Sequence, residues 1–187
     1  RKRLLKLDEL HIYDCSVPLV EGIKWHMSFD QAVKEIQTAL KPLGDEYVEQ
    51  VTQGLSVDRW TDRYENKGKR SGAYSSGCYD SNPFILMNYR EDNINSVYTL
   101  AHEAGHSMHS FYSRKNQPYL YSDYTIFVAE VASTFNEALL TRHFLSQDID
   151  PDMRIYLICR EIDNFRGTLY RQTMFAEFEY QVYKAAE

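Results

Sequence analysis

The stretch SVYTLAHEAGHSMHSFY, residues 96–112, decides the fold of this chain. Its apolar and aromatic residues recur at nearly helical period, and Asn93 or Asn95 can cap its start, so we expect a helix through it. On that helix His102 and His106 lie one turn apart on the same face. Two imidazoles in this arrangement can bind one Zn²⁺.

A catalytic zinc takes three protein ligands and keeps a fourth position for water. The segment TIFVAEVASTFNEALLTRHFL, residues 125–145, is expected to be a long helix and offers Glu130 as the third ligand. We expect Glu130 on a buried stripe with Phe127 and Val131, where a carboxylate is costly unless it binds a metal or another cation. Glu137 lies on the same side and is the alternative, in less apolar surroundings. This ligand set is typical of a gluzincin-type metallopeptidase with one zinc ion.

Glu103 is rotated by about 100° along the helix from His102, so we predict that it is the catalytic base rather than a ligand. It would accept a proton from a water molecule whose pKa the zinc lowers, and would pass it to the leaving amine of a cleaved peptide. Ala104 and Gly105 are small, which predicts a close crossing of helices at this point. A glycine inside a helix costs about 1 kcal/mol relative to alanine, and close packing is the reason we assign to it.

The surroundings of the motif leave two questions open. Ligating histidines usually donate their second N–H to an acceptor, and the candidates at helical spacing from Glu130 are Ser133, Thr134 and Glu137. His109 lies close to one turn beyond His106. It is a candidate substrate-binding residue, and the alternative is an ordinary packed or solvated side chain.

The rest of the chain predicts further helices and one strand region. Helical periodicity, capping residues, Pro and Gly divide it into segments. The expected elements are the end of a helix at LLKLDEL (4–10), an extended connector at HIYDCSVPLV (11–20), a helix capped by Ser28 over FDQAVKEIQTALKPLG (29–44), a helix over DEYVEQVTQGL (45–55), a strand at FILMNY (84–89), the HEAGH helix over about 93–113, and a last helix opening after Asp150 and Pro151 and running to the end. The expected fold class is therefore mainly α with a small β-element.

The segment GAYSSGCYDSNPFILMNY, residues 72–89, is polar and rich in Gly and Tyr before it becomes β-leaning. If FILMNY is an edge strand beside the zinc helix, an extended peptide can pair with it through main-chain hydrogen bonds. The alternative is a plain structural hairpin. The candidate substrate-binding residues on this reading are Gly72, Ala73, Tyr74, Leu86, Asn88 and the neighbouring His109.

Composition narrows the class of protein and its partners. A chain of 187 residues with 43% hydrophobic residues fits one globular domain. Its net charge of −6 leaves no basic face for nucleic acid, and it has no apolar run long enough for a membrane helix. The three cysteines form no CxxC pair, which favours the reducing cytoplasm. Because the chain starts without Met and stops inside a helical pattern, we expect residues 1–187 to be part of one catalytic domain, truncated at both ends.

Several separated segments together resemble the oligoendopeptidase F family, bacterial relatives of thimet oligopeptidase. These segments are HEAGHSMHSFYS, QPYLYSDYTIFVAEVASTFNEALL, KRSGAYSSGCYDSNPFILMNY and RQTMFAEFE. The resemblance covers nearly the whole chain. It implies a helical zinc metallopeptidase catalytic domain whose channel admits short unstructured peptides, with a small β-sheet or hairpin at residues 72–89 beside the cleft. It also implies zinc ligands at His102, His106 and Glu130 and a general base at Glu103.

The family has a tyrosine and a histidine that stabilise the oxyanion, and no residues here match them. We therefore expect the isolated chain to hold the metal site without the full catalytic machinery. The leading prediction is a cytoplasmic zinc endopeptidase for oligopeptides. The alternatives are a related zinc carboxypeptidase, in which Arg70 or Arg90 would hold a terminal carboxylate, and a non-catalytic helical module that retains the motif. The oligomeric state is left open.

Overall fold

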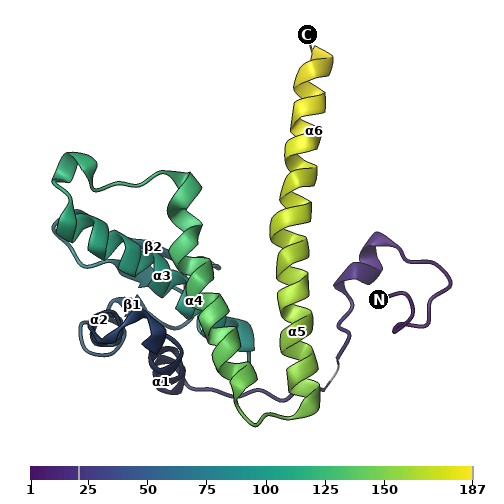
Figure 1. Cartoon of the computed structure of the whole chain (residues 1–187), viewed down its shortest axis with the longest axis horizontal. Helices are drawn as coiled ribbons and strands as arrows, with labels where there is room; N and C mark the ends of the chain where they lie inside the picture. The colour runs from purple at the N-terminus through teal and green to yellow at the C-terminus, as the bar shows by residue number, and fades with distance from the viewer. Residues whose placement is uncertain (21, 187) are drawn as a thin grey trace. The chain divides into compact units, whose positions relative to one another are not determined.

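The computed structural model describes residues 1–20 and 22–186, which form two compact units (Figure 1). One unit is Lys24–Gln147, and the other combines Arg1–Ile23 with Asp148–Glu187. The fold is mainly α with one small sheet, as the sequence predicts. Within the described residues, every helix is too short or too polar to cross a membrane.

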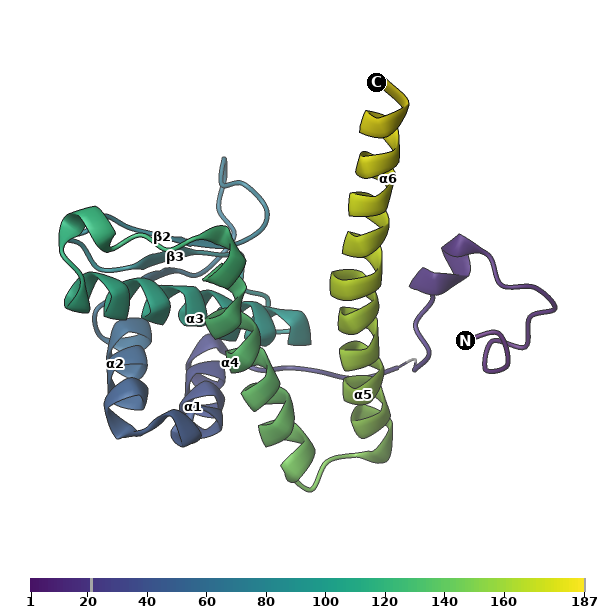
Figure 2. The same ribbon diagram turned by 45° about the horizontal axis from the view of Figure 1, so that its top comes forward.

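The unit Lys24–Gln147 is built around one central helix. Figure 2 shows α3 with the small sheet on one side and α1 and α2 on the other. Its helical elements are α1 (Phe29–Ala39), η2 (Lys41–Leu43), α2 (Asp45–Ser56), α3 (Ile94–Asn116), η3 (Tyr119–Tyr121) and α4 (Ile126–Ser146). Its strands are β1 (Thr61–Asp62), β2 (Tyr74–Ser76) and β3 (Phe84–Leu86).

The start of α1 confirms the cap predicted at Ser28. The Ser28 hydroxyl accepts from the Gln31 N–H at 3.3 Å, while the Gln31 side chain accepts from the Ser28 N–H at 2.8 Å. This reciprocal pair satisfies two of the main-chain donors that a helix start leaves open. The apolar face of α1 is buried, with Phe29 and Ile36 each 1% exposed. The helix ends before Gly44, whose φ of 94° is unfavourable for residues with a Cβ.

The central helix α3 is buried along most of its length and crosses α4 closely. Asn93 is its cap and accepts from the Asn95 N–H at 3.0 Å. A Cβ placed on Gly105 would lie 2.6 Å from the Ser133 Cα and 2.8 Å from the Ala132 carbonyl oxygen of α4. No side chain fits in that space, so the crossing predicted from Gly105 is confirmed.

The C-terminal half of α4 is held against α1 and the core. Leu140 is fully buried, and Phe144 packs edge-on against Trp25 at a ring distance of 5.8 Å. His143 also contacts Glu35 of α1, with 2.6 Å between its Nε2 and the carboxylate. Packing and polar contacts together fix this half of the helix.

The three-stranded sheet has the order β1-β3-β2. The central strand β3 runs parallel to β1 and antiparallel to β2, with Ile85 opposite both Thr61 and Ser75. The prediction that FILMNY forms an edge strand open to a peptide is therefore wrong, because both edges of β3 are paired. The strand β1 is only two residues long, too short to show a period in the sequence.

The second unit differs from the sequence prediction at its start. Residues 4–10 form turns and a bend rather than the end of a helix, and the expected extended connector contains the 3₁₀ helix η1 (Ile12–Ser16). The physical reason for η1 is local, since the Asp14 carboxylate accepts from the His11 N–H at 2.8 Å and caps the turn.

The C-terminal segment is helical, as predicted. Its elements are α5 (Pro151–Phe165), the π-helical turn η4 (Arg166–Tyr170) and α6 (Arg171–Ala186). The Asp150 carboxylate caps α5 by accepting from the Asp152 N–H at 2.8 Å, and Pro151 takes the first helical position. Within this unit Arg1 pairs with Asp163 at 2.5 Å.

Candidate metal centre

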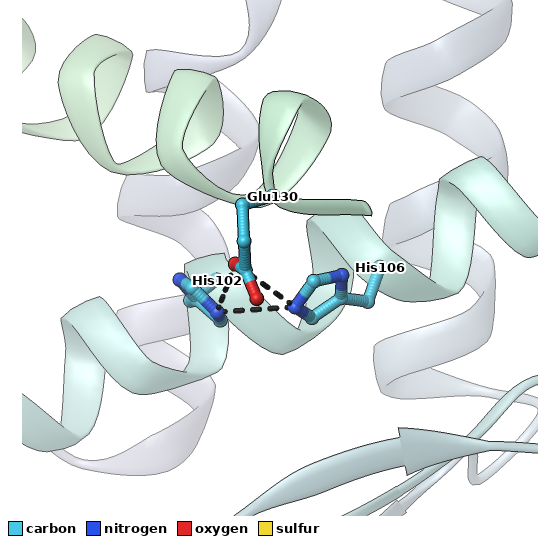
Figure 3. A group of neighbouring side chains, drawn as sticks. All are labelled: His102, His106 and Glu130. Carbon is cyan, nitrogen blue, oxygen red and sulfur yellow. Dashed lines mark hydrogen bonds and ion pairs between the residues drawn. The ribbon is translucent and has the colours of Figure 1, made fainter. Parts of the chain in front are cut away.

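The crossing of α3 and α4 brings together His102, His106 and Glu130 (Figure 3). The Nε2 atoms of the two histidines are 3.1 Å apart. The Glu130 Oε2 atom lies 3.2 Å from the Nε2 of His102 and 3.4 Å from that of His106. Three potential donor atoms thus form a nearly equilateral triangle.

The triangle has the dimensions of a zinc site. Zn²⁺ binds histidine nitrogen at about 2.0–2.1 Å in tetrahedral geometry, which places its ligand atoms about 3.3–3.4 Å apart. Two imidazoles and one carboxylate are also the donor set that leaves an open position in catalytic zinc sites. Within the described part of the chain, this is the one group of three or more His, Cys, Asp or Glu side chains so arranged.

A carboxylate orients the first histidine. The Oε1 atom of Glu137 lies 2.7 Å from the Nδ1 of His102. An ionised carboxylate can only accept, so Nδ1 carries the proton and Nε2 presents its lone pair to the triangle. Burial lowers the pKa of His102, but the hydrogen bond and charge of Glu137 outweigh burial and the net pKa is raised.

The second histidine and the glutamate also have partners on α4. Burial lowers the pKa of His106, against the raising effects of the Glu130 charge and of a hydrogen bond to the Ala129 main chain. The Ser133 hydroxyl donates to the Glu130 Oε2 at 2.8 Å, and the Thr134 hydroxyl donates to the Glu130 main-chain carbonyl. The sequence offered three candidate partners for the ligating histidines. Of these, Glu137 orients His102, while Ser133 and Thr134 contact Glu130.

The prediction that Glu130 lies on a buried apolar stripe is wrong. The sequence predicts a buried stripe, but Phe127 is 90% exposed, Val131 is 63% exposed, and the Glu130 side chain is 59% exposed. The first turns of α4 are apolar on all sides, so periodicity could not assign a buried face. Glu130 faces α3 because of the helix crossing and Ser133, not because it belongs to an apolar stripe.

Glu103 lies outside the triangle, on the side of α3 that packs against β2. Its residue is only 7% exposed, and burial raises the pKa of its carboxyl group. The charge of His102 and the main-chain amide of Ser75 lower that pKa, but the net shift is upward. A carboxylate with a raised pKa holds a proton more readily than an exposed glutamate.

A pair of hydroxyl groups joins α3 to β2 beside Glu103. The Oγ atoms of Ser75 and Ser107 are 2.8 Å apart, and Ser107 is fully buried. Neither serine was singled out from the sequence. A signal existed for Ser107, since it lies one turn from Glu103 on the same face of the helix.

Most of the predicted substrate-binding residues lie side by side at β2 and β3, while His109 lies on α3. Alternate residues of a strand point to opposite faces, so Ser75 points to α3 while the side chain of Tyr74 points away. Tyr74 and Leu86 line a hollow of roughly 1090 Å³ on the outer face of the sheet, and His102, His106 and Glu130 do not line it. The Asn88 side chain instead donates to the carbonyls of Arg70 and Gly72, at 2.9 and 3.1 Å.

The remaining candidates have structural partners. The ring of His109 stacks on Tyr124 with 3.7 Å between the centroids and 9° between the planes. Tyr124 was not singled out, and no periodic pattern in its loop could have done so. Arg90, a candidate for a carboxypeptidase pocket, forms an ion pair with Asp92 at 3.0 Å.

Comparison with known proteins places the chain in a family. The model of peptidase family M3 matches residues 1–187. The chain is 51% identical over 187 residues to oligopeptidase PepF of Bacillus subtilis, covering 100% of this chain and 28% of that protein. It is 46% identical over 184 residues to an oligoendopeptidase F homolog of Borreliella burgdorferi, covering 98% of this chain and 31% of that protein. The chain thus spans less than a third of the length of these relatives.

Solved structures agree with the sequence relatives. A crystal structure of a putative peptidase from Chlamydophila abortus matches with a TM-score of 0.88 and 47% identity, over 100% of this chain and 31% of that one. A crystal structure of oligoendopeptidase-F from Enterococcus faecium matches with a TM-score of 0.57 and 31% identity, over 96% of this chain and 23% of that one. This chain belongs to peptidase family M3.

Proposed function

We propose that this chain carries the metal centre of a zinc-dependent endopeptidase that hydrolyses short, unstructured peptides. His102, His106 and Glu130 would bind one Zn²⁺, and Glu103 would be the general base. The observation that carries the proposal is the triangle of donor atoms, with sides of 3.1, 3.2 and 3.4 Å. Membership of family M3 and relatives named oligopeptidase or oligoendopeptidase support the activity.

The residues around the triangle suit this chemistry. When bound, the zinc ion acts as a Lewis acid that lowers the pKa of water and polarises a carbonyl oxygen. The Glu103 carboxylate accepts the proton of the attacking water and donates it to the leaving amine. Glu137 keeps the proton of His102 on Nδ1, so that Nε2 stays available as a ligand.

We further propose that the substrate backbone pairs with β2 rather than with FILMNY. Among the described residues, β2 is paired with β3 alone, so no strand occupies its outer edge, where the Ser75 main chain contacts Glu103. The same strand lies against α3 beside Glu103, through the Ser75–Ser107 contact. Pairing through main-chain groups recognises an extended chain and is insensitive to most of its side chains. It therefore favours short unstructured peptides over folded proteins.

The proposed location is the cytoplasm, and the proposed partners are peptides rather than nucleic acid or membranes. The cysteines Cys15, Cys78 and Cys159 are all free thiols. The net charge of −6 disfavours a polyanionic partner. Residues 1–187 are proposed to be part of one catalytic domain of a longer enzyme.

The test is the substitution Glu103→Gln in the full-length protein. The amide fills the same space but cannot accept a proton, so hydrolysis of a quenched fluorescent peptide should fall by about 10²–10⁴-fold while zinc content stays at one ion per chain. Glu49→Gln, the same change at an exposed position of α2, should leave both unchanged. Retained zinc with a rate loss below about tenfold would refute the role of Glu103.

A second substrate separates the endopeptidase from a carboxypeptidase. A peptide acetylated at its N-terminus and amidated at its C-terminus has no free carboxylate for an arginine to hold. The endopeptidase should cleave it internally, as mass spectrometry of the products would show. Cleavage only of peptides with a free C-terminus, one residue at a time, would favour the carboxypeptidase. A protein that binds zinc but cleaves neither peptide would favour the non-catalytic module.

A further inference from the structure

Three contacts tie the segment before α4 to one side of α3. The ring of His109 stacks face to face on Tyr124, with centroids 3.7 Å apart. The Tyr124 hydroxyl lies 2.9 Å from the Ser110 Oγ atom. The Ser113 hydroxyl donates to the Ser122 carbonyl at 2.5 Å. Residues of two successive turns of α3 therefore hold the chain just before α4 begins.

The start of α4 has little else to hold it. Its N-cap residue, Thr125, makes no side-chain capping hydrogen bond. Its first residues, Ile126 and Phe127, are 88% and 90% exposed, so burial does not fix the first turn. Helix starts usually gain stability from a cap or from packing, and among the described residues this one has neither.

Glu130 lies between two anchors of α4. After it comes the crossing, where Ser133 lies against Gly105 too closely for any side chain between them. Before it comes the stack of His109 and Tyr124. With the crossing alone, the first turns of α4 could rotate about it. Even a small rotation would displace the Glu130 carboxylate, whose oxygen must lie within about 0.2 Å of its bonding distance to the metal.

The stack is made by the faces of the two rings, and the Nδ1 atom of His109 takes no part in it. The Nδ1 atom of His109 is buried without a hydrogen-bond partner among the described residues. A buried polar atom without a partner is unfavourable, so a histidine kept only for packing gains nothing from its Nδ1 atom. An all-carbon ring at this position should serve the same purpose. A metal ligand or a substrate-binding imidazole would not tolerate that change.

We propose that His109 and Tyr124 are positioning residues that set Glu130 for metal binding by fixing the start of α4. The inference rests on the proposed zinc centre and adds to it the residues that preform the third ligand. It also replaces the reading of His109 as a substrate-binding residue. The expected property of the intact site is a Glu130 carboxylate held in place before the metal arrives.

The test compares two tyrosines of the same connecting segment in the full-length protein. Zinc affinity is measured by competition with a chelator, and ligand geometry by the visible absorption of the cobalt-substituted protein. Tyr124→Ala should weaken zinc binding by about 10–100-fold, as loss of ligand support does elsewhere, and should change the cobalt bands. Tyr121→Ala, at a position 71% exposed and outside the stack, should leave affinity and bands unchanged. Tyr124→Phe and His109→Phe keep both rings and should retain wild-type affinity within about threefold.

Each outcome decides the inference. Equal zinc affinity for Tyr124→Ala and Tyr121→Ala overturns it. A folded His109→Phe protein with zinc affinity as weak as that of Tyr124→Ala also overturns it, because the imidazole nitrogens would then be the required groups. Should Tyr124→Ala fail to fold, Tyr124→Leu keeps apolar volume without a ring face and carries the same comparison. A wild-type protein that binds neither zinc nor cobalt overturns the metal centre itself, which distinguishes that failure from failure of the stack.

Discussion

The two helices that supply the candidate ligands are held in different ways. α3 starts with an asparagine cap and is buried between the sheet and α1 and α2, so His102 and His106 are placed by the core. α4 begins without a side-chain cap and with exposed apolar residues, and its packing against the core begins only at the crossing, at Ser133. Two ligands are therefore part of the fold, while the third depends on a few contacts. Substitutions on either side of the crossing test this contrast.

The largest effect is expected where the two helices meet. Gly105→Ala places a methyl group 2.6 Å from the Ser133 Cα, and main-chain atoms cannot rotate out of the way. The free energy of unfolding should fall by about 1–3 kcal/mol or more, and zinc binding should be lost as α4 moves away. Denaturant unfolding and metal analysis of the purified protein measure the two effects.

Another helical glycine provides the control. Gly167 has no atom within 4 Å of a built Cβ, and its φ is not positive. Gly167→Ala should therefore leave zinc binding unchanged and stabilise the protein by up to about 1 kcal/mol, through the higher helix propensity of alanine. If Gly105→Ala is no more destabilising than Gly167→Ala, the close crossing does not hold in solution.

The next effect concerns the orientation of His102. Glu137→Ala removes the acceptor 2.7 Å from Nδ1 and should weaken zinc binding by about 10–100-fold. Glu137→Gln keeps an acceptor oxygen without the charge, and its loss should be several-fold smaller. Chelator competition ranks the two variants, with Glu49→Ala as the exposed control. Equal losses for Ala and Gln would show that charge alone matters, and no loss in either would remove Glu137 from the site.

The same contrast explains what the sequence could predict. The extent of α3 follows from its periodic apolar pattern and its capping residue. The helix crossing follows from Gly105, because a glycine inside a helix lowers stability and close packing explains its presence. The first turns of α4 are apolar on every side, so the face of Glu130 could not be read from its neighbours. Glu137 is the partner of His102 because of the way α3 and α4 are rotated relative to each other. The periodic pattern within one helix gives no information about that rotation.

The sheet shows a further limit. The prediction for FILMNY identified a strand but not its position, because β1 has only two residues and pairs across a long stretch of chain. Because β1 pairs with β3, the edge strand of the sheet next to α3 is β2 rather than β3. Strand order is a property of non-local contacts, whereas strand propensity is local.

The smallest effect concerns the contact that places β2 beside Glu103. Ser107→Ala leaves the Ser75 hydroxyl without its partner and should lower the free energy of unfolding by about 0.5–1.5 kcal/mol. Ser75→Ala should have a similar effect. The double variant should cost less than the sum of the two, because a pair is removed once and no unpaired hydroxyl remains. The cycle therefore reports the energy of this one contact.

The stability cycle alone does not show a role for β2 in binding, so peptide kinetics must accompany it. If β2 holds the substrate backbone, the single variants should raise KM for a short peptide, because the strand that pairs with the peptide shifts. Ser56→Ala, at an exposed position of α2, is the serine control and should leave KM unchanged. Additive stability effects, or equal KM values for Ser107→Ala and Ser56→Ala, would mean that the hydroxyl pair does not position the strand. The open edge of β2 would then need another anchor.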